Sequence, residues 1–137
     1  MDPVQRFSAA RVARLATAGP DGAPHLVPLV FALTEDTIYS CVDFKPKRTT
    51  ALRRLKNIAA NPSVSILVDH YADDWDQLWW VRVDGVAEVL DATTAEGTAA
   101  IDALAAKYSQ YAARRPQGPV IAVRSLRWYH WSAVSTS

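Results

Sequence analysis

Short turns connect most of the strand-like segments in this sequence, and only two longer helical patterns interrupt them. The strand patterns cover residues 12–17, 24–33, 38–42, 63–69 and 78–90, with a last one at 120–123 that resumes at 127–131. Their order, three strands, a helix, two strands, a helix and one strand, lacks the regular strand–helix alternation of parallel sheets. It predicts a mainly β (α+β) fold, a six-stranded antiparallel barrel with flanking helices. At 137 residues, half of them hydrophobic, the chain is expected to form one domain over residues 1–137.

The first two strands are predicted to form a hairpin. Gly19-Pro20-Asp21-Gly22 lies between them and is a strong turn signal. Within the second strand, Pro28 lacks the N–H that a strand paired on both sides must donate. Pro28 therefore predicts an edge strand, a bulge or a place where a ligand meets the backbone.

Two longer helices follow from apolar residues at helical spacing. The first runs out of a basic segment, carries Leu52, Leu55 and Ile58, and is expected to end near Asn61-Pro62. Thr93 and Glu96 have the spacing of a capping box before the second, whose buried side is marked by Ile101, Leu104, Tyr108 and Tyr111. Residues 3–10 predict a short opening helix.

Positive charge is concentrated where the first longer helix begins. Six cations and no acid occur between residues 45 and 56: Lys45, Lys47, Arg48, Arg53, Arg54 and Lys56. A helix start with unpaired N–H groups, cationic side chains and the hydroxyls of Thr49 and Thr50 suits a phosphate or another anion. A solvated helix face is the other interpretation. The cations within the strand-to-helix turn itself favour the anion site, whereas those further along suit a solvated face or partner contacts.

The remaining composition excludes several classes of function. The formal net charge of +1 argues against a general nucleic-acid binder. Cys41, the one cysteine, is expected to be a buried thiol. No catalytic motif is present, so no catalytic residue is identified. No zinc site is predicted, because His25, His70 and His130 have no cysteine or carboxylate at metal-ligand spacing. No membrane-length apolar run and no signal-peptide pattern is found, so a cytoplasmic protein is expected.

Tryptophan is abundant, with five residues in the chain. Trp79 and Trp80 are adjacent on a strand, so their rings point to opposite faces of the sheet and at most one can be fully internal. The other is expected to cover a ligand or a partner subunit. Trp128 and Trp131, near the end of the chain, are interpreted in the same way. An equally open interpretation is that these tryptophans are aromatic plugs at a barrel mouth.

Several of these segments resemble the pyridoxamine 5′-phosphate oxidase-like split β-barrel family. The resemblance lies in Leu15-Ala16-Thr17 with its following turn, Pro24-His25-Leu26-Val27-Pro28, the basic strand-to-helix turn, Asn61-Pro62 before residues 64–69, and Arg82-Val83-Asp84-Gly85. It covers nearly the whole chain. Within that family the sequence is most similar to the actinobacterial branch of coenzyme F-420-dependent, or flavin/deazaflavin, oxidoreductases.

That resemblance implies a homodimer with two equivalent cofactor sites at the subunit interface and a small-molecule substrate, with no nucleic acid and no membrane as partner. It implies that the cofactor phosphate is held by Lys45, Lys47, Arg48 and Thr49, with Thr50 as a further candidate. The ring would lie near His25, Val27, Pro28 and Val30, and Trp79, Trp80 or Trp131 of the other subunit would close the site.

F-420 carries a phosphodiester and an oligoglutamate tail, which suits so basic a turn. The activity implied is hydride transfer from reduced deazaflavin to a small conjugated or aromatic acceptor. Two alternatives remain open: an FMN-dependent oxidase or reductase of the pyridoxamine phosphate oxidase type, and a non-catalytic cofactor-binding or haem-binding module.

Overall fold

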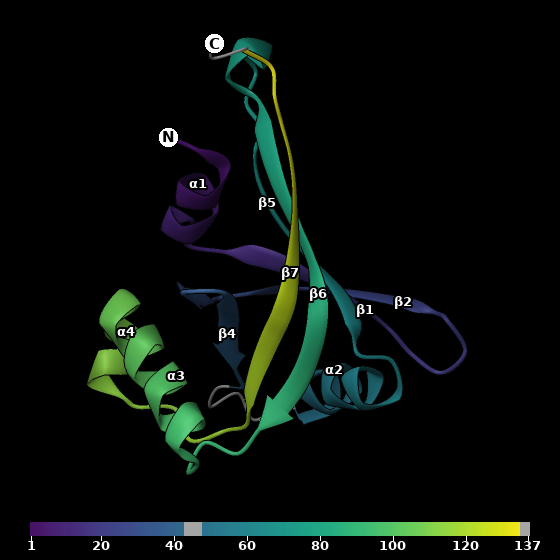
Figure 1. Cartoon of the computed structure of the whole chain (residues 1–137), viewed down its shortest axis with the longest axis vertical. Coiled ribbons are helices and arrows are strands. Elements are labelled where there is room, and N and C mark those ends of the chain that lie inside the picture. Colours follow the sequence, from purple (N-terminus) through teal and green to yellow (C-terminus); the bar gives the residue numbers. More distant parts are fainter. Residues whose placement is uncertain (43–47, 135–137) are drawn as a thin grey trace.

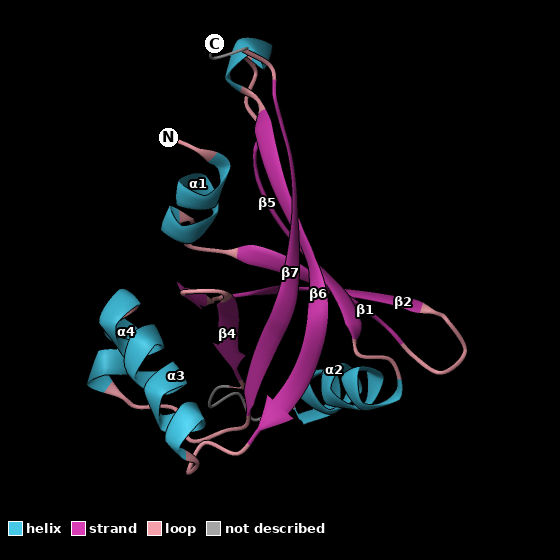
Figure 2. Ribbon diagram, in the orientation of Figure 1, coloured by secondary structure: helices cyan, strands magenta, loops and turns pink. Residues whose placement is uncertain are grey.

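Seven strands form one antiparallel sheet that curls into a half-barrel, with helices packed around it (Figures 1 and 2). This computed structural model describes residues 1–42 and 48–134, and for residues 48–52 the backbone alone. The strands are β1 (Ala13–Ala18), β2 (Pro24–Leu29), β3 (Ala32–Thr34), β4 (Thr37–Cys41), β5 (Ser63–His70), β6 (Trp79–Leu90) and β7 (Val120–Ser132). The helices are α1 (Pro3–Ala9), α2 (Arg48–Ala60), the 3-10 turn η1 (Trp75–Gln77), α3 (Ala95–Lys107) and α4 (Ser109–Ala113).

The predicted hairpin is present as β1 and β2, paired from Ala13 opposite Leu29 to Ala18 opposite Pro24. Its turn is closed by the Gly22 N–H donating to the Gly19 carbonyl at 2.9 Å. Gly22 has a φ of +78°, a backbone conformation that glycine adopts without steric cost. β2 is an edge strand, which is one of the three alternatives that Pro28 predicted.

The described residues form seven strands where the sequence predicted six, because the predicted strand 24–33 breaks at Val30 and Phe31. The backbone there bonds to side chains: Ser40 Oγ donates to the Val30 carbonyl at 2.8 Å, and Lys107 Nζ donates to that of Phe31 at 2.9 Å. The Tyr108 hydroxyl accepts the Phe31 N–H at 3.2 Å. Sequence-based analysis missed the break because its hydrogen-bond partners lie up to 77 residues away.

This break joins the two edges of the sheet. The strand order is β2-β1-β5-β6-β7-β4-β3, so β2 and β3 are the outermost strands although they are consecutive in the chain. Residues 30 and 31 are therefore the covalent link that holds the curled sheet together. We call Val30, Phe31, Ser40, Lys107 and Tyr108 the seam.

A bulge bends the two longest strands, β6 and β7. Their register shifts between Asp84 and Val86, and on β7 Ser125 adopts a φ of +54°. At Gly85 an added Cβ would lie 2.7 Å from Val123 Cγ1 and 2.8 Å from the Arg124 carbonyl oxygen, so the strands approach too closely there for a side chain. Beyond the bulge, β5, β6 and β7 extend past α1 toward the C-terminal end (Figure 1).

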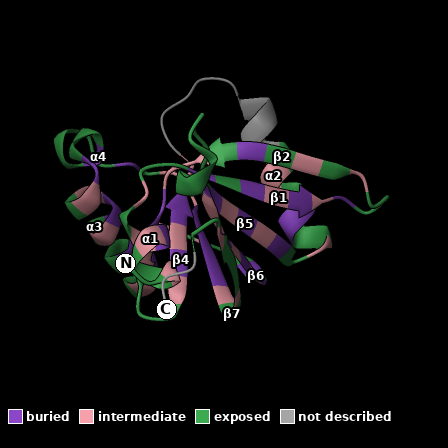
Figure 3. Ribbon diagram, turned by 90° about the horizontal axis from the view of Figure 1, so that it is seen from above, coloured by how far each residue is buried: buried purple, intermediate pink, exposed green. Residues whose placement is uncertain are grey.

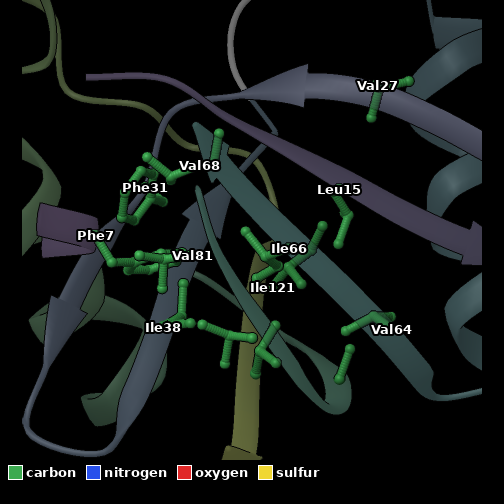
Figure 4. Close-up of a cluster of buried hydrophobic side chains, with 14 of the residues drawn as sticks. Phe7, Leu15, Val27, Phe31, Ile38, Val64, Ile66, Val68, Val81 and Ile121 are labelled. Carbon is green, nitrogen blue, oxygen red and sulfur yellow. The ribbon is translucent and has the colours of Figure 1, made fainter. Parts of the chain in front are cut away.

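The core lies inside the curl of the sheet (Figures 3 and 4). Phe7 of α1, Ile58 of α2 and Phe31 of the strand break join it, and the strands supply its remaining buried members: Ala13, Leu15, Val27, Ile38, Val64, Ile66, Val68, Val81, Val83, Ala87, Ile121 and Val123. A second cluster under α3 contains the buried thiol of Cys41, as predicted, together with Ile101, Leu104, Tyr108 and Tyr111.

The helix boundaries differ from the sequence prediction at one cap and at Tyr108, where the predicted second longer helix is interrupted between α3 and α4 by an extended residue. α2 ends at Ala60, just before Asn61-Pro62. For α3 the predicted cap Thr93 is wrong by one residue: Thr94 accepts the Gly97 N–H at 3.0 Å, while the N–H and hydroxyl of Thr93 both donate to the Asp91 carboxylate. In the part of the chain that the structure describes, no helix combines the length and the apolar character needed to span a membrane.

Candidate functional site

The two faces of the sheet differ sharply in burial. One row across β1, β5, β6 and β7 points into the core and consists of Leu15, Ile66, Val83 and Trp128. The neighbouring row points outward and runs across five strands: Pro28, Arg14, Leu67, Arg82 and Tyr129. None of these five outward residues is buried. This row and its outward neighbours Leu26, Trp80 and Trp131 make up what we call the open face.

Aromatic and cationic side chains are fixed on the open face. Trp80 lies directly opposite Trp131 on the neighbouring strand. The Arg82 guanidinium lies 4.5 Å from the centre of the Tyr129 ring, and its Nε donates to Asp84 Oδ1 at 3.0 Å. Both the stacking and the hydrogen bond restrict Arg82 to one orientation.

A cavity of about 420 Å³ opens on this face and is lined by Leu67, Asp69, Tyr71, Trp80 and Arg82. Its volume lies in the range of small-molecule sites, which are mostly apolar with a few placed polar groups. The wall combines an indole, a phenol and a guanidinium. Such a surface can hold a flat conjugated ring by stacking and orient a carbonyl or an anionic group by hydrogen bonding.

The structure separates the predicted ring-binding residues. Pro28, Trp80 and Trp131 lie on the open face. Val27 points into the core, and His25 lies opposite Thr17 on that same inward side. Val30 belongs to the seam.

Trp79 is also on the inward side, where the Arg6 guanidinium lies 5.1 Å from the centre of its ring. The predicted set therefore does not form one surface within a single chain.

Distance along the sheet reinforces this separation. β2 and β6 have β1 and β5 between them, so Pro28 is roughly 14 Å from the backbone of β6 at a strand spacing of about 4.8 Å. A single ring lying on Pro28 would not stack on Trp80 of the same chain.

One polar atom on the inward side of β2 stands out. His25 Nδ1 is buried and has no hydrogen-bond partner, although its strand neighbour Thr17 accepts a bond from Asn57 Nδ2 of α2 at 3.0 Å. A buried nitrogen without a partner is costly and is a natural point for a ligand to bond. This is the observation that keeps His25 in the candidate site.

The predicted phosphate-binding residues, or their side chains, lie outside the part of the chain that the structure describes. Lys45 and Lys47 lie outside the described residues, as do the side chains of Arg48, Thr49 and Thr50. The backbone of residues 48–50 forms the first turn of α2, whose later residue Ile58 packs in the core. The assignment of these five residues stays a prediction.

Two clusters were not found by sequence-based analysis. Arg82 with Tyr129 depends on the register of β6 against β7, and Arg6 with Trp79 depends on how α1 packs. Alternation along residues 78–90 correctly separated the faces of Trp79 and Trp80, but it carries no information about which strand lies alongside.

A curled antiparallel sheet with an edge joined to its opposite edge and flanking helices defines a split β-barrel of the pyridoxamine 5′-phosphate oxidase type. The family model for pyridoxamine 5′-phosphate oxidase matches residues 3–134. The chain belongs to this family.

Three solved structures illustrate the fold in other organisms. A FAD-binding protein from Mesorhizobium loti shares 22% identity over 93% of this chain and 89% of its own, with a TM-score of 0.67. The heme storage protein HutZ from Vibrio cholerae shares 16% over 94% and 91%, with a TM-score of 0.72. The conserved hypothetical protein Rv2991 from Mycobacterium tuberculosis shares 24% over 100% and 92%, with a TM-score of 0.71. No curated protein matches the sequence.

Proposed function

We propose that the protein is a cytoplasmic, homodimeric F-420-dependent oxidoreductase that reduces a small conjugated or aromatic acceptor. The open face supports this proposal most directly, because it presents indole, phenol and guanidinium groups around a cavity of about 420 Å³. The basic segment between residues 45 and 56 supplies the second argument, since it suits the phosphodiester and glutamates of F-420. Within the family, the flavin-binding neighbour makes a redox ring a reasonable occupant.

The residues present fit such a ring. Trp80 and Arg82 line a cavity of suitable size on the open face, whereas His25 Nδ1, a buried nitrogen without a hydrogen-bond partner, lies on the inward side of the sheet and does not line that cavity. When bound, reduced F-420 would supply the hydride for the acceptor. The role of the chain is to orient the two molecules: Trp80 stacks on a flat body, Arg82 donates to an oxygen, and the dimer excludes water.

Two copies are part of this proposal because one chain leaves the site incomplete. Pro28 and Trp80 lie too far apart for one ring, whereas a second copy placed on the open face would bring its own Trp80 or Trp131 toward the Pro28 side. Leu26 (67% exposed) and Trp131 (42% exposed) are unusually open for such apolar side chains. The dimer would cover them.

Parallel titrations of F-420 and FMN, each followed by fluorescence quenching, test the choice of cofactor. We expect tighter binding of F-420 than of FMN, and weaker F-420 binding after Lys47→Ala or Arg48→Ala, with a larger loss at low salt. Arg115→Ala is the matched control, because Arg115 is an exposed cation paired with Asp102 at 2.7 Å, far along the chain from the basic segment. Tighter FMN binding, or equal losses in all three variants, would contradict the proposal.

Haem binding is the second candidate, favoured by the similar fold of HutZ. His70 is the histidine best placed for it, because it is exposed beside a cavity and its ring stacks on Trp79 at 6.2 Å. A Soret band that appears on adding haem and is lost in His70→Ala would favour this candidate over F-420. Yellow flavin absorbance in the purified protein would instead favour the FMN-dependent enzyme.

A further inference from the structure

A hollow of about 450 Å³ lies between α1 and the end of β5 and adjoins the cavity on the open face, since Asp69 lines both. β5 continues to His70, but β1 pairs with it only as far as Arg14 opposite Leu67. Beyond that point α1 and residues 10–12 border the space. The residues around it are Met1, Arg6, Ala9, Ala10, Arg11, Val12, Arg14, Val68, Asp69, His70 and Trp79.

Three arginines and a single carboxylate border this hollow. Arg14 is 3.5 Å from that carboxylate, Asp69. Arg11 donates to the Lys107 carbonyl at 2.9 Å and lies over the Tyr108 ring. Among the described residues neither Arg6 nor Arg11 forms an ion pair. The hollow therefore carries an excess of positive charge that is held in place by stacking.

Arg6 is the most favourable of these cations for a ligand. Its guanidinium carbon lies 5.1 Å from the centre of the Trp79 ring. Its side-chain N–H groups form no hydrogen bond with another described residue, so the edge of the guanidinium is available to donate. That edge matches the two oxygens of a carboxylate. The apolar residues beside it, among them Val12 and Val68, offer contact to a hydrocarbon body.

A second hollow of about 410 Å³ shares Arg6, His70 and Trp79 but adds the acidic Asp76 with Gln77. Each hollow has one carboxylate, but the second is lined by one arginine where the first has three, so it is the less favourable place for an anion. The α1 side of Arg6 is therefore the better site.

We propose that the hollow between α1 and the end of β5 binds a small aromatic carboxylate, with the carboxylate on Arg6 and the ring against the apolar wall. This site adjoins the open-face cavity at Asp69, but Arg6 and Trp79 do not line that cavity, and the inference does not rest on F-420. It is tested on the protein without cofactor, so its failure and that of the proposed function are distinguishable.

The probe is 2-naphthoate, compared with its uncharged amide by isothermal titration calorimetry. We expect 2-naphthoate to bind at least about tenfold more tightly than the amide, because only the carboxylate accepts two charge-assisted hydrogen bonds. Arg6→Gln should remove that preference, and Arg6→Lys should keep part of it by retaining the charge. Arg127→Gln is the matched control, since Arg127 is an exposed arginine on β7 outside the hollow, and it should change nothing.

The indole N–H signals in ¹H–¹⁵N spectra locate the ligand. Trp79→Phe identifies the Trp79 signal, which should shift on adding 2-naphthoate while the Trp80 signal stays in place. Equal affinity for the amide, equal losses in Arg6→Gln and Arg127→Gln, or shifts confined to Trp80 and Trp131 would each overturn the proposal. Folded spectra of each variant exclude loss of structure as the cause.

Discussion

The seam and the open face belong to one sheet, but the groups at the seam are paired and covered within the chain, whereas side chains of the open face are left uncovered. At the seam, the backbone groups that the strand break leaves without strand partners bond to Ser40, Lys107 and Tyr108, and α3 covers the cluster beside it. On the open face, Trp80 and Trp131 lie opposite each other on neighbouring strands, and Trp131 is 42% exposed. The first arrangement stabilises the curl of the sheet. The second leaves binding surface uncovered, so stability and function are expected to separate between the two regions.

The largest expected effect is the loss of a fully buried ring at the seam. Phe31 is 0% exposed and packs on Phe7 with ring centres 4.8 Å apart. Phe31→Ala should lower the free energy of unfolding by about 3–5 kcal/mol, measured by urea denaturation. Tyr129→Ala on the open face should cost less than about 1 kcal/mol. Similar losses at the two positions would refute the division between the regions.

A smaller loss is expected when one seam hydroxyl is removed. Tyr108→Phe keeps the ring but leaves the buried Phe31 N–H without its acceptor, at a cost of about 1–3 kcal/mol in unfolding free energy. Tyr71→Phe is the matched control, because Tyr71 is 64% exposed and should show no change. If Tyr108→Phe is as stable as the unmodified protein, the hydroxyl is not what fixes the strand break.

The open face was more predictable from sequence than the seam. Alternation over residues 78–90 separates Trp80 from Trp79, and the turn Gly19–Gly22 with Pro28 correctly gives an edge hairpin, because these signals are local. The break at Phe31 depends on Lys107 and Tyr108, whose position follows only from the packing of α3. Likewise the pairing of Arg6 with Trp79 depends on the docking of α1. Local sequence patterns predicted the helices, the strands and the face on which each strand residue lies. Long-range packing, which these patterns do not encode, determines which side chains come into contact at the seam and at Trp79.

A weaker effect should appear in the pH dependence of stability. Burial, and then the nearby charge of Arg11, lower the pKa of Lys107 from 10.5 to about 8 in the folded protein. Below about pH 8 both states carry the proton and the folded state bears the cost of the buried charge. Between about pH 8 and 10.5 the unfolded chain binds more protons, so stability should rise with pH.

Chemical denaturation between pH 8 and 10 measures this rise. Lys107→Met should flatten it, because no charge then remains to be lost at the seam. Lys56→Met is the control, since Lys56 is exposed on α2 and its removal should leave the slope unchanged. If stability still rises with pH in Lys107→Met, another titrating group causes the rise. The charge of Lys107 would then have no effect on the stability of the seam.

The smallest effect on stability, and the clearest one on assembly, is expected on the open face. Trp131→Ala should change the unfolding free energy of the chain by less than about 1 kcal/mol, because 42% of this residue is already exposed. Light scattering should nonetheless show a lower mass at equal concentration, since a large aromatic at the centre of an interface contributes strongly to binding. Trp75→Ala, at a 76% exposed position on η1 outside this face, should keep the mass of the unmodified protein. An unchanged mass in Trp131→Ala would mean that a second copy does not cover this surface. A loss of unfolding free energy as large as that of Phe31→Ala would mean that Trp131 stabilises the folded chain and not an interface.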